Sequence, residues 1–261
     1  MKVSLITACY NSAAIISTCF DSVLSQQGVD LEYIVVDGGS KDGTVDLLKV
    51  YEPKFAGRMR WVSERDQGMY DAINKGIKLA TGDVVGILNA DDMFESPDTL
   101  AHVAEAFTDA VDAVYADIRF VKDDLNSTVR YYSAKHWKPW MLQWGKMPPH
   151  PSVYIRRELF EKYGMYKLGY DIAADYELLI RYLRMAKLKT RYLNESLVRM
   201  RMGGKSTRGW QSFMTLNKEI VRGNRENGYF CCFPMLLPKY LFKIFEFILP
   251  RLGFKRKGET I

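Results

Sequence analysis

Two neighbouring carboxylates, Asp91 and Asp92, come directly after an apolar run over 84–88 that is typical of a short buried strand. Divalent cations such as Mg²⁺ prefer oxygen ligands, and Mg²⁺ is usually held by one or two carboxylates together with substrate phosphates. The pair therefore predicts a cation, Mg²⁺ or Mn²⁺, that joins the protein to a diphosphate. The alternative is a solvated turn, because aspartates are also frequent in turns.

A second polar loop, over 37–44, follows the apolar run 33–36. Asp37 could accept a hydrogen bond from an N–H group of a nucleobase. The glycines after it would let the backbone come close to a ligand. The loop matches neither of the phosphate-binding patterns GxxxxGK[ST] and GxGxxG. It therefore indicates a ligand contact without naming the ligand.

These loops need a scaffold, and the first half of the chain alternates strand-like and helix-like runs. Strands are predicted over 3–8, 33–36, 60–63 and 84–88, and helices over 12–24, 44–51, 69–80 and from 96 onward. This order favours a parallel, doubly wound sheet. Ligands of such sheets bind outside the carboxyl ends of the strands. Polar clusters follow the four strands at 8–11, 37–44, 64–68 and 89–92.

The second half of the chain is less regular. We expect strands over 111–118, 129–132 and 152–155, and a helix over 173–185. The aromatic and proline-rich segment 137–149 is typical of a long loop, and a second glycine loop lies over 202–207.

The tail has its own pattern. From Pro238, apolar residues at helical spacing predict an amphipathic helix over 238–249, and basic residues follow as far as Lys257. An apolar face with nearby cations suits an anionic membrane surface, so we expect peripheral membrane contact. The alternative is that this helix packs on the rest of the protein.

The amino-acid composition limits the classes of protein to which this chain can belong. The chain has 261 residues, of which 48% are hydrophobic and 26% charged, which excludes a wholly disordered or fibrous chain. Its formal net charge of +6 comes from scattered basic residues, so nucleic-acid binding is not indicated. The four cysteines form no CxxC pair and predict free thiols in a reducing compartment, the cytoplasm. We find neither a signal-peptide pattern nor 18 uninterrupted apolar residues.

Three motifs together resemble the signature of family 2 glycosyltransferases with the GT-A fold. They are Val-Asp-Gly-Gly-Ser-x-Asp-Gly-Thr at 36–44, Asp-Gln-Gly-Met-Tyr-Asp-Ala-Ile-Asn-Lys-Gly at 66–76 and Leu-Asn-Ala-Asp-Asp at 88–92. Further along, three shorter motifs are similar to those of bacterial colanic-acid, O-antigen and capsule polysaccharide transferases. These are His-Pro-Ser at 150–152, Ala-Asp-Tyr-Glu-Leu at 174–178 and Gly-Gly-Lys-Ser at 203–206. The resemblance covers roughly residues 1–210.

The resemblance implies an α/β fold of the GT-A class. This fold has a Rossmann-like, mostly parallel central sheet flanked by helices, here with an amphipathic helical extension at the carboxyl end. We expect a GT-A domain over 1–210, with a nucleotide-sugar-binding half at 1–118 and an acceptor-binding half at 119–210. The helical extension would then be 211–261, in contact with a membrane.

The resemblance also implies a donor, a nucleoside diphosphate sugar and most often a UDP-sugar. The expected nucleotide-sugar-binding residues are Thr7, Tyr10, Asn11, Asp37, Asp66, Asn89, Asp91, His150 and Lys205. The family's metal motif is usually Asp-x-Asp, and its first position here is Asn89. Asp91 is therefore the expected main ligand of Mg²⁺ or Mn²⁺, and Asp92 a supporting one.

The catalytic base of the family often lies in a Glu-Asp pair at a helix start. The pair here is Ala174-Asp175, so the resemblance makes Asp175 the general base of an inverting hexosyltransferase. An acceptor hydroxyl must lose its proton as it attacks the anomeric carbon, and a positioned carboxylate can take that proton. The leaving diphosphate gains charge that a metal, Lys205 or backbone N–H groups could stabilise. His150 is expected to contact a donor phosphate or the acceptor.

The expected acceptor is a lipid-linked saccharide at the inner face of the cytoplasmic membrane, in the synthesis of a bacterial surface polysaccharide such as lipopolysaccharide or capsule. A homo-oligomer stays open. One alternative is a non-catalytic nucleotide-sugar-binding or membrane-scaffold protein, since the first metal carboxylate and the Glu beside Asp175 are missing. A sugar nucleotidyltransferase is a further alternative. It would need a glycine-rich basic loop after the first strand, where this chain has Thr-Ala-Cys-Tyr-Asn-Ser at 7–12.

Overall fold

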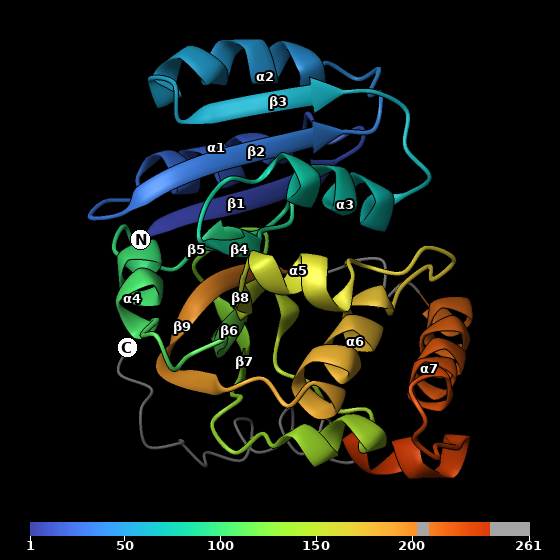
Figure 1. Cartoon of the computed structure of the whole chain (residues 1–261). Helices are drawn as coiled ribbons and strands as arrows, with labels where there is room; N and C mark the ends of the chain where they lie inside the picture. Colours follow the sequence, from blue (N-terminus) through green and yellow to red (C-terminus); the bar gives the residue numbers. More distant parts are fainter. Residues whose placement is uncertain (203–208, 241–261) are drawn as a thin grey trace.

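A nine-stranded sheet runs through the molecule, with helices against its faces (Figure 1). The computed structural model describes residues 1–202 and 209–240. The strands are β1 (Lys2–Cys9), β2 (Asp30–Asp37), β3 (Met59–Ser63), β4 (Val84–Ile87), β5 (Met93–Phe94), β6 (Ala113–Val121), β7 (Thr128–Tyr132), β8 (Tyr154–Arg156) and β9 (Thr190–Arg201). The α-helices are α1 (Ile16–Leu24), α2 (Thr44–Tyr51), α3 (Met69–Leu79), α4 (Thr99–Ala106), α5 (Glu158–Tyr163), α6 (Ala174–Leu179) and α7 (Gly209–Glu226). Shorter helical segments are η1 (Glu52–Phe55), η2 (Pro139–Trp144), η3 (His150–Ser152), η4 (Ile180–Met185) and η6 (Phe233–Leu236).

The amino-terminal half of the sheet is parallel, as the alternation of elements predicts. β3, β2, β1 and β4 lie side by side in this order, and all three pairings are parallel. Leu5 of β1 packs in the core cluster that includes α1, whereas Ile6 packs in the cluster that includes α3. Helices therefore cover both faces, which is why apolar residues lie on both sides of β1, β2 and β4.

The carboxyl-terminal half of the sheet is mixed, which the sequence does not indicate. β8 pairs antiparallel with β4 and β6, β7 pairs antiparallel with β6, and β5 pairs antiparallel with β9. Only β6 and β9 are parallel here. Parallel neighbours need a crossover of a dozen or more residues, whereas the short connection 122–127 lets β7 turn straight back on β6. β5 and β9 are absent from the predicted elements, because β5 is only two residues long and β9 is interrupted by polar residues.

Other elements differ from the prediction in detail. The segment 137–149, expected to be a loop, contains the helical turn η2. The helix expected over 173–185 is α-helical to Leu179 and continues as the π-helix η4. π-Helical turns often accompany functional sites. The first helix begins at Ile16, after a turn in which the Ser12 carbonyl accepts the first N–H groups.

Only the start of the predicted tail helix falls within the described residues. Residues 237–240 are helical, and 241–249 lie outside the described ranges. Within these ranges, no helix is long and apolar enough to cross a membrane. All four cysteines are unpaired, as the sequence predicts.

The pairing of β4 with β8 joins the two halves of the sheet. Gly86 of β4 lies opposite Tyr154 of β8, and a Cβ atom added at Gly86 would lie 2.1 Å from the Tyr154 ring. Tyr154 is fully buried. The ring cannot move away without disturbing the core, so this position requires glycine.

Gly86→Ala should therefore lower the free energy of unfolding by about 1–3 kcal/mol, because overpacking forces side chains or backbone to shift. Gly223→Ala is the control, since Gly223 lies inside α7 and its Cβ would meet Glu177 at an ordinary 3.5 Å. Alanine is the better helix former, so the control should be neutral or stabilising by up to about 1 kcal/mol. Urea unfolding followed by circular dichroism measures both variants. Equal stabilities would show that the β4–β8 pairing tolerates a side chain.

Candidate active site

The Asp37 carboxylate is buried at the end of β2, and protein donors hold both of its oxygens. Oδ2 accepts the N–H groups of Gly39 at 3.1 Å and Ser40 at 3.0 Å, and the Ser63 hydroxyl at 2.6 Å. Oδ1 accepts the Ser40 hydroxyl. Burial alone would raise the pKa of Asp37, but these hydrogen bonds outweigh burial and lower it. The carboxylate is thus anionic and fixes the shape of its loop, while its predicted contact with a nucleobase stays a prediction.

The loops after β1, β2 and β3 meet at Gly38. A Cβ atom added at Gly38 would lie 2.6 Å from Asp66 Oδ2 and 3.3 Å from Tyr10 Cδ2. Tyr10 is 63% exposed, so its ring offers a free face. We call Tyr10, Gly38 and Asp66 the cradle. An exposed aromatic face beside a carboxylate suits a flat, polar ligand such as a nucleobase.

The cradle is braced by Asn11. Its N–H group donates to Ser40 Oγ at 2.7 Å, and its Oδ1 accepts the N–H of Lys41 at 3.0 Å. Asn11 has a φ of 48°, a left-handed conformation that asparagine adopts more readily than most residues. Thr7 differs, because its side chain is fully buried and its hydroxyl donates to the Leu88 carbonyl at 2.8 Å. The structure therefore brings Asn11 to the cradle but does not bring the Thr7 side chain to its surface.

The two carboxylates after β4 lie at different depths. Asp91 is partly exposed, whereas Asp92 is 1% exposed. Asp92 Oδ2 accepts the Asn89 amide at 2.7 Å, and Oδ1 has no hydrogen-bond partner. Burial raises the pKa of Asp92 well above its usual range and the charge of Asp91 adds to the rise, while Asn89 and Arg201 oppose it. A buried oxygen without a partner is costly.

These two carboxylates fit a divalent cation only in part. A cation would satisfy the unpartnered Asp92 oxygen, and the neighbouring Asp91 could share it. Across residues 1–202 and 209–240, however, no three His, Cys, Asp or Glu side chains cluster as a metal site requires. Substrate oxygens would have to complete the coordination.

Asp175 is partly exposed in the first turn of α6. Its Oδ1 accepts the Tyr176 N–H at 2.7 Å, and the Tyr70 hydroxyl lies 3.5 Å from the same oxygen. Burial raises the pKa of Asp175 above its usual value, and the positive charge of a protonated His150 and these two donors oppose the rise. The side chain is thus a carboxylate of raised basicity at a helix N-terminus.

An aromatic network surrounds Asp175 and ties it to α3. The rings of Tyr70 and Tyr166 stack with centroids 5.7 Å apart. The Tyr166 hydroxyl is 2.6 Å from His150 Nε2. Asn74, one turn after Tyr70, donates to the Tyr166 carbonyl at 2.8 Å and accepts its N–H at 3.0 Å. Burial lowers the pKa of His150 while Asp175 opposes this shift, so the imidazole is neutral at neutral pH.

Glu219 of α7 holds the segment that leads into Asp175. Its Oε1 accepts the N–H of Asp171 at 2.6 Å, and its Oε2 accepts those of Ile172 at 2.9 Å and Ala173 at 2.8 Å. N–H groups just before a helix have no partner within that helix, so they need an acceptor from elsewhere. α7 therefore supports the site from beyond residue 210. The domain division at 210 itself stays a prediction.

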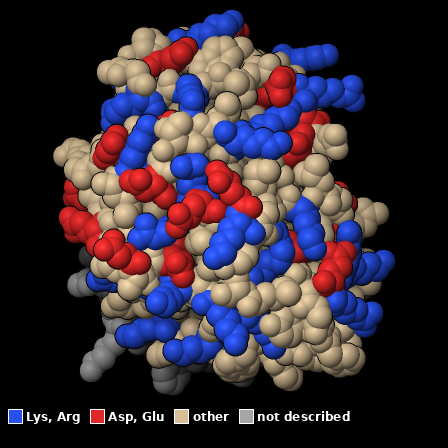
Figure 2. Space-filling view, in the orientation of Figure 1, with Lys and Arg blue, Asp and Glu red and all other residues tan. Residues whose placement is uncertain are grey.

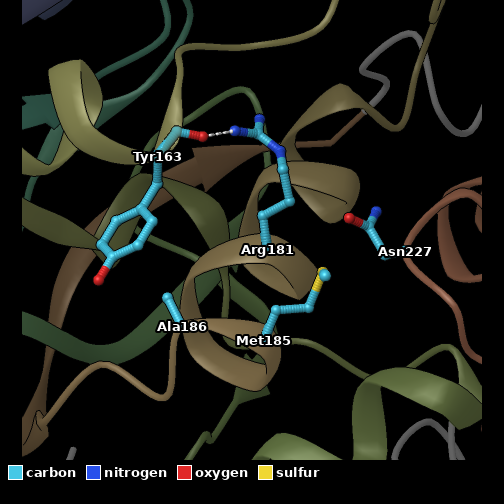
Figure 3. A pocket seen from close by; sticks show the side chains of 5 residues that line it. All are labelled: Tyr163, Arg181, Met185, Ala186 and Asn227. Carbon is cyan, nitrogen blue, oxygen red and sulfur yellow. Dashed lines mark hydrogen bonds between the residues drawn. The ribbon is translucent and has the colours of Figure 1, made fainter.

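A hollow of about 340 Å³ lies beside η4 (Figure 3). It is lined by Tyr163, Arg181, Met185, Ala186 and Asn227. Figure 3 shows Arg181 turned towards the Tyr163 carbonyl, and its other N–H groups bind Glu177, Gly164 and Met165. The only charged side chain in the lining is therefore already paired, and no predicted site residue is part of it.

The predicted residues thus fall into three groups. They are Tyr10, Asn11, Asp37 and Asp66 around the cradle, then Asn89, Asp91 and Asp92 after β4, and His150 with Asp175 near α6. Lys205 lies outside the described residues.

Sequence analysis missed several side chains that support these groups. Tyr70 and Asn74 lie four residues apart inside the motif 66–76, and this spacing places them on one helix face, so the motif carried a usable signal. Tyr166 and Glu219 carry no such signal, because only the fold brings them near Asp175.

Comparison with known proteins identifies the family. The family described as "Glycosyl transferase family 2" matches residues 4–169. A PGL/p-HBAD biosynthesis glycosyltransferase of Mycobacterium bovis is 36% identical over 194 residues, which is 73% of this chain and 73% of the relative. The chain belongs to glycosyl transferase family 2. The resemblance seen in the motifs is confirmed, and this family 2 glycosyltransferase is a sugar-transferring enzyme by descent.

Solved structures confirm the fold of this family 2 glycosyltransferase. The S. aureus TarS fragment 1–349, solved in complex with UDP-GlcNAc, has a TM-score of 0.66 at 18% identity, over 85% of this chain and 66% of that one. Of the longer TarS chain, this protein covers 39%. Mannosyltransferase PcManGT from Pyrobaculum calidifontis, in complex with GDP-Man and Mn²⁺, has a TM-score of 0.66 at 22% identity, over 97% of this chain and 71% of that one. At these identities the likeness shows the fold alone, and that fold is the predicted α/β, GT-A class.

Asp37→Asn should lower the free energy of unfolding by about 1–3 kcal/mol without any nucleotide, because the buried amide offers one acceptor oxygen to donors that now use two. Asp66→Asn is the matched control, since its carboxylate accepts only the Gly68 N–H, at 2.8 Å, and is partly exposed. Urea unfolding in nucleotide-free buffer measures both. If Asp37→Asn kept wild-type stability, the carboxylate would serve ligand contact rather than the loop.

Proposed function

We propose that this enzyme transfers a hexose, with inversion, from a nucleoside diphosphate sugar to a hydroxyl of a lipid-linked saccharide. The product would be a repeat unit of a bacterial surface polysaccharide. The observation that carries the proposal is that one continuous segment, the loop with Asp66 and the helix α3 after it, reaches both the cradle and Asp175. Asp66 lies against Gly38 in the cradle, and Tyr70, four residues on, lies 3.5 Å from Asp175. The expected nucleoside contact and the expected base are therefore fixed relative to each other.

The donor is proposed to bind at the cradle. The exposed Tyr10 ring would stack on the base, and Asp66 would accept hydrogen bonds from the base or ribose. TarS was solved with UDP-GlcNAc, which favours a UDP-sugar. PcManGT was solved with GDP-Man, so a donor panel should include guanine nucleotides.

The proposed chemistry centres on Asp175. The acceptor hydroxyl gives its proton to this carboxylate as its oxygen attacks the anomeric carbon, and the bond from that carbon to the diphosphate breaks. The Tyr176 N–H donates to Oδ1, and the Tyr70 hydroxyl, which donates to the Ile172 carbonyl at 2.5 Å, lies against the same oxygen. Oδ2 is therefore the oxygen proposed to face the acceptor. Neutral His150 beside it would contact the acceptor or a donor phosphate. Lys205 or backbone N–H groups would meet the charge on the departing diphosphate.

Asp91, with Asp92 in support, would hold Mg²⁺ or Mn²⁺ against the diphosphate. The unpartnered Asp92 oxygen supports this assignment. A bound divalent cation supplies positive charge where the leaving group becomes more negative. Asn89, in the first position of the family's Asp-x-Asp motif, donates to Asp92 and so orients it.

The predicted place of action is the cytoplasm, with peripheral contact at the inner face of the cytoplasmic membrane. The apolar and basic sequence of the tail over 238–257 supports this placement. The acceptor is proposed to be lipid-linked for the same reason. Membrane contact through the tail is a separate hypothesis from the chemistry, and its failure would leave the catalytic assignments untouched.

A panel of UDP- and GDP-sugars with lipid-linked saccharide acceptors, analysed by mass spectrometry, tests the function. We expect one donor to give a product heavier than its acceptor by one sugar residue. A protein that binds a nucleotide sugar tightly but transfers nothing to any acceptor or to water would favour the non-catalytic alternative. The missing glutamate at Ala174 is the best support for that alternative.

Asp175→Asn should lower turnover by about 100-fold or more with nearly unchanged affinity for the nucleoside diphosphate, because the amide cannot accept the proton. Asp171→Asn is the matched control, since Asp171 is exposed in the same segment and only its backbone N–H binds Glu219. Steady-state transfer rates and calorimetry of diphosphate binding give the two quantities. Near-wild-type turnover in Asp175→Asn would remove this residue from the mechanism.

The pH profile checks the same assignment. The base acts only when ionised, so kcat/KM should rise with pH through the pKa of Asp175. Burial raises that pKa, so the acid limb should lie above 3.8, the ordinary aspartate value. Asp175→Asn should lack this limb.

Asp91→Ala should lower donor affinity and turnover together by about 10-fold or more, the loss expected when a metal site is damaged. Asp46→Ala on α2 is the control, because its carboxylate is exposed and bridges only to Lys49. Calorimetry with UDP in the presence and absence of Mn²⁺ measures the coupling. Full activity of the wild type in EDTA would contradict the metal role.

A further inference from the structure

One end of the molecule exposes a group of large apolar side chains. They come from three segments, 133–147, 178–193 and 227–240, which we call the platform. The exposed side chains, each at least 36% accessible, are Trp140, Trp144, Met185, Phe230, Phe233 and Leu237. In Figure 1 the parts of the chain that hold η2 and η6 lie at the lower end of the view, opposite α2. Exposed apolar groups gathered in this way mark a contact surface more often than scattered ones do.

Hydrogen bonds and close contacts join the three segments into one surface. Gln143 of η2 donates to the Phe230 carbonyl at 2.7 Å and accepts from Arg184 at 2.7 Å. Gly145, where η2 ends, lies so close to the third segment that an added Cβ atom would be 2.8 Å from Lys239 Cδ. The exposed apolar side chains therefore lie on adjoining segments.

The charged residues of the platform are all basic. The first segment contains three lysines, the second five Lys and Arg residues, and the third one lysine, and none of the three contains Asp or Glu. In the whole chain, by contrast, 37 basic residues accompany 31 acidic ones. The lowest part of Figure 2 shows the same bias, with Lys and Arg among uncharged residues and Asp and Glu higher up. Glu177 and Glu226 lie just before the second and third segments, where they pair with Arg181 and Arg222. The three segments themselves carry a net positive charge.

We propose that the platform docks on a membrane surface rich in anionic lipid. Tryptophan and phenylalanine are suited to the interface between headgroups and hydrocarbon, and cations beside them are attracted by anionic lipids. A second copy of this chain is a poorer occupant, because one positive surface would face another. The proposal uses described residues only, so it is independent of the tail. After residue 240 the sequence continues with apolar and basic residues.

Docking through the platform would also set the distance between Asp175 and the membrane surface. Met185 comes ten positions after Asp175 along α6 and η4, which is at most about 15 Å at the α-helical rise of 1.5 Å per residue. A base at this height suits a saccharide that stands on a lipid headgroup. This last point rests on the proposed function, whereas docking itself does not.

Sedimentation of the full-length protein with vesicles tests the proposal. The vesicles contain phosphatidylglycerol and phosphatidylcholine in equal parts, or phosphatidylcholine alone. One platform variant carries Trp140→Ser with Phe230→Ser, and the other carries Lys135→Glu with Lys138→Glu. Each should bind the anionic vesicles more weakly than the wild type by a factor of about ten or more. The control carries Val50→Ser with Lys49→Glu on α2, which is equally exposed at the opposite end, and should bind like the wild type.

The outcomes distinguish docking on lipid from contact through the tail or between copies of the chain. Wild-type binding by both platform variants would overturn the proposal and assign any membrane contact to the tail. A dimer in light scattering that Trp140→Ser with Phe230→Ser dissociates would overturn it in favour of a contact between copies. Thermal melting and nucleotide affinity should equal those of the wild type in all variants. Loss of catalysis in Asp175→Asn with unchanged vesicle binding would show that the two proposals stand or fall separately.

Discussion

Two hydrogen bonds between the Asn74 side chain and the Tyr166 backbone hold the halves of this enzyme together above the sheet. Asn74 belongs to α3, which covers the parallel strands, whereas Tyr166 belongs to the chain that leads into α6. The amide uses both its donor and its acceptor, so the pair fixes orientation as well as distance. Because Asp66 precedes α3 and Tyr70 lies in its first turn, any shift of this helix would move the cradle and the surroundings of Asp175 together.

The carboxylates of the site fall into two kinds, according to how many donors they meet. Asp37 meets several, and its pKa is lowered, so it is a permanent anion that gives a loop its shape. Asp92 and Asp175 meet few donors, and burial raises their pKa values. A carboxylate that has few hydrogen-bond donors around it can still bind a proton or a cation, as a general base or a metal ligand must. Glycine is needed where the backbone passes close to one of these carboxylates, as Gly38 does beside Asp66.

The parallel half of the fold could be predicted from the sequence because its signals are local. Mainly apolar runs predicted β1, β2 and β4, and the loops after them contain the candidate carboxylates in the expected order. The mixed half could not be predicted in this way, because β9 owes its place to pairing with β6 over 113–121 rather than to its own pattern. Thr7 shows the same limit on the scale of one side chain. Its expected place at the nucleoside site stays a prediction, while alternation along β1 turns its side chain towards the core.

Glu219 has a consequence for how relatives of this enzyme diverge. The family match ends at residue 169, yet the backbone that presents Asp175 is anchored by a carboxylate 50 positions beyond that limit. The family match marks the residues that relatives share, whereas the folded site of this chain also depends on residues beyond that match. Exchanging carboxyl-terminal segments between relatives would therefore exchange part of the support of the proposed catalytic centre. A chimera would keep the loop before Asp175 in place only if its new carboxyl-terminal helix supplied an acceptor for those three N–H groups.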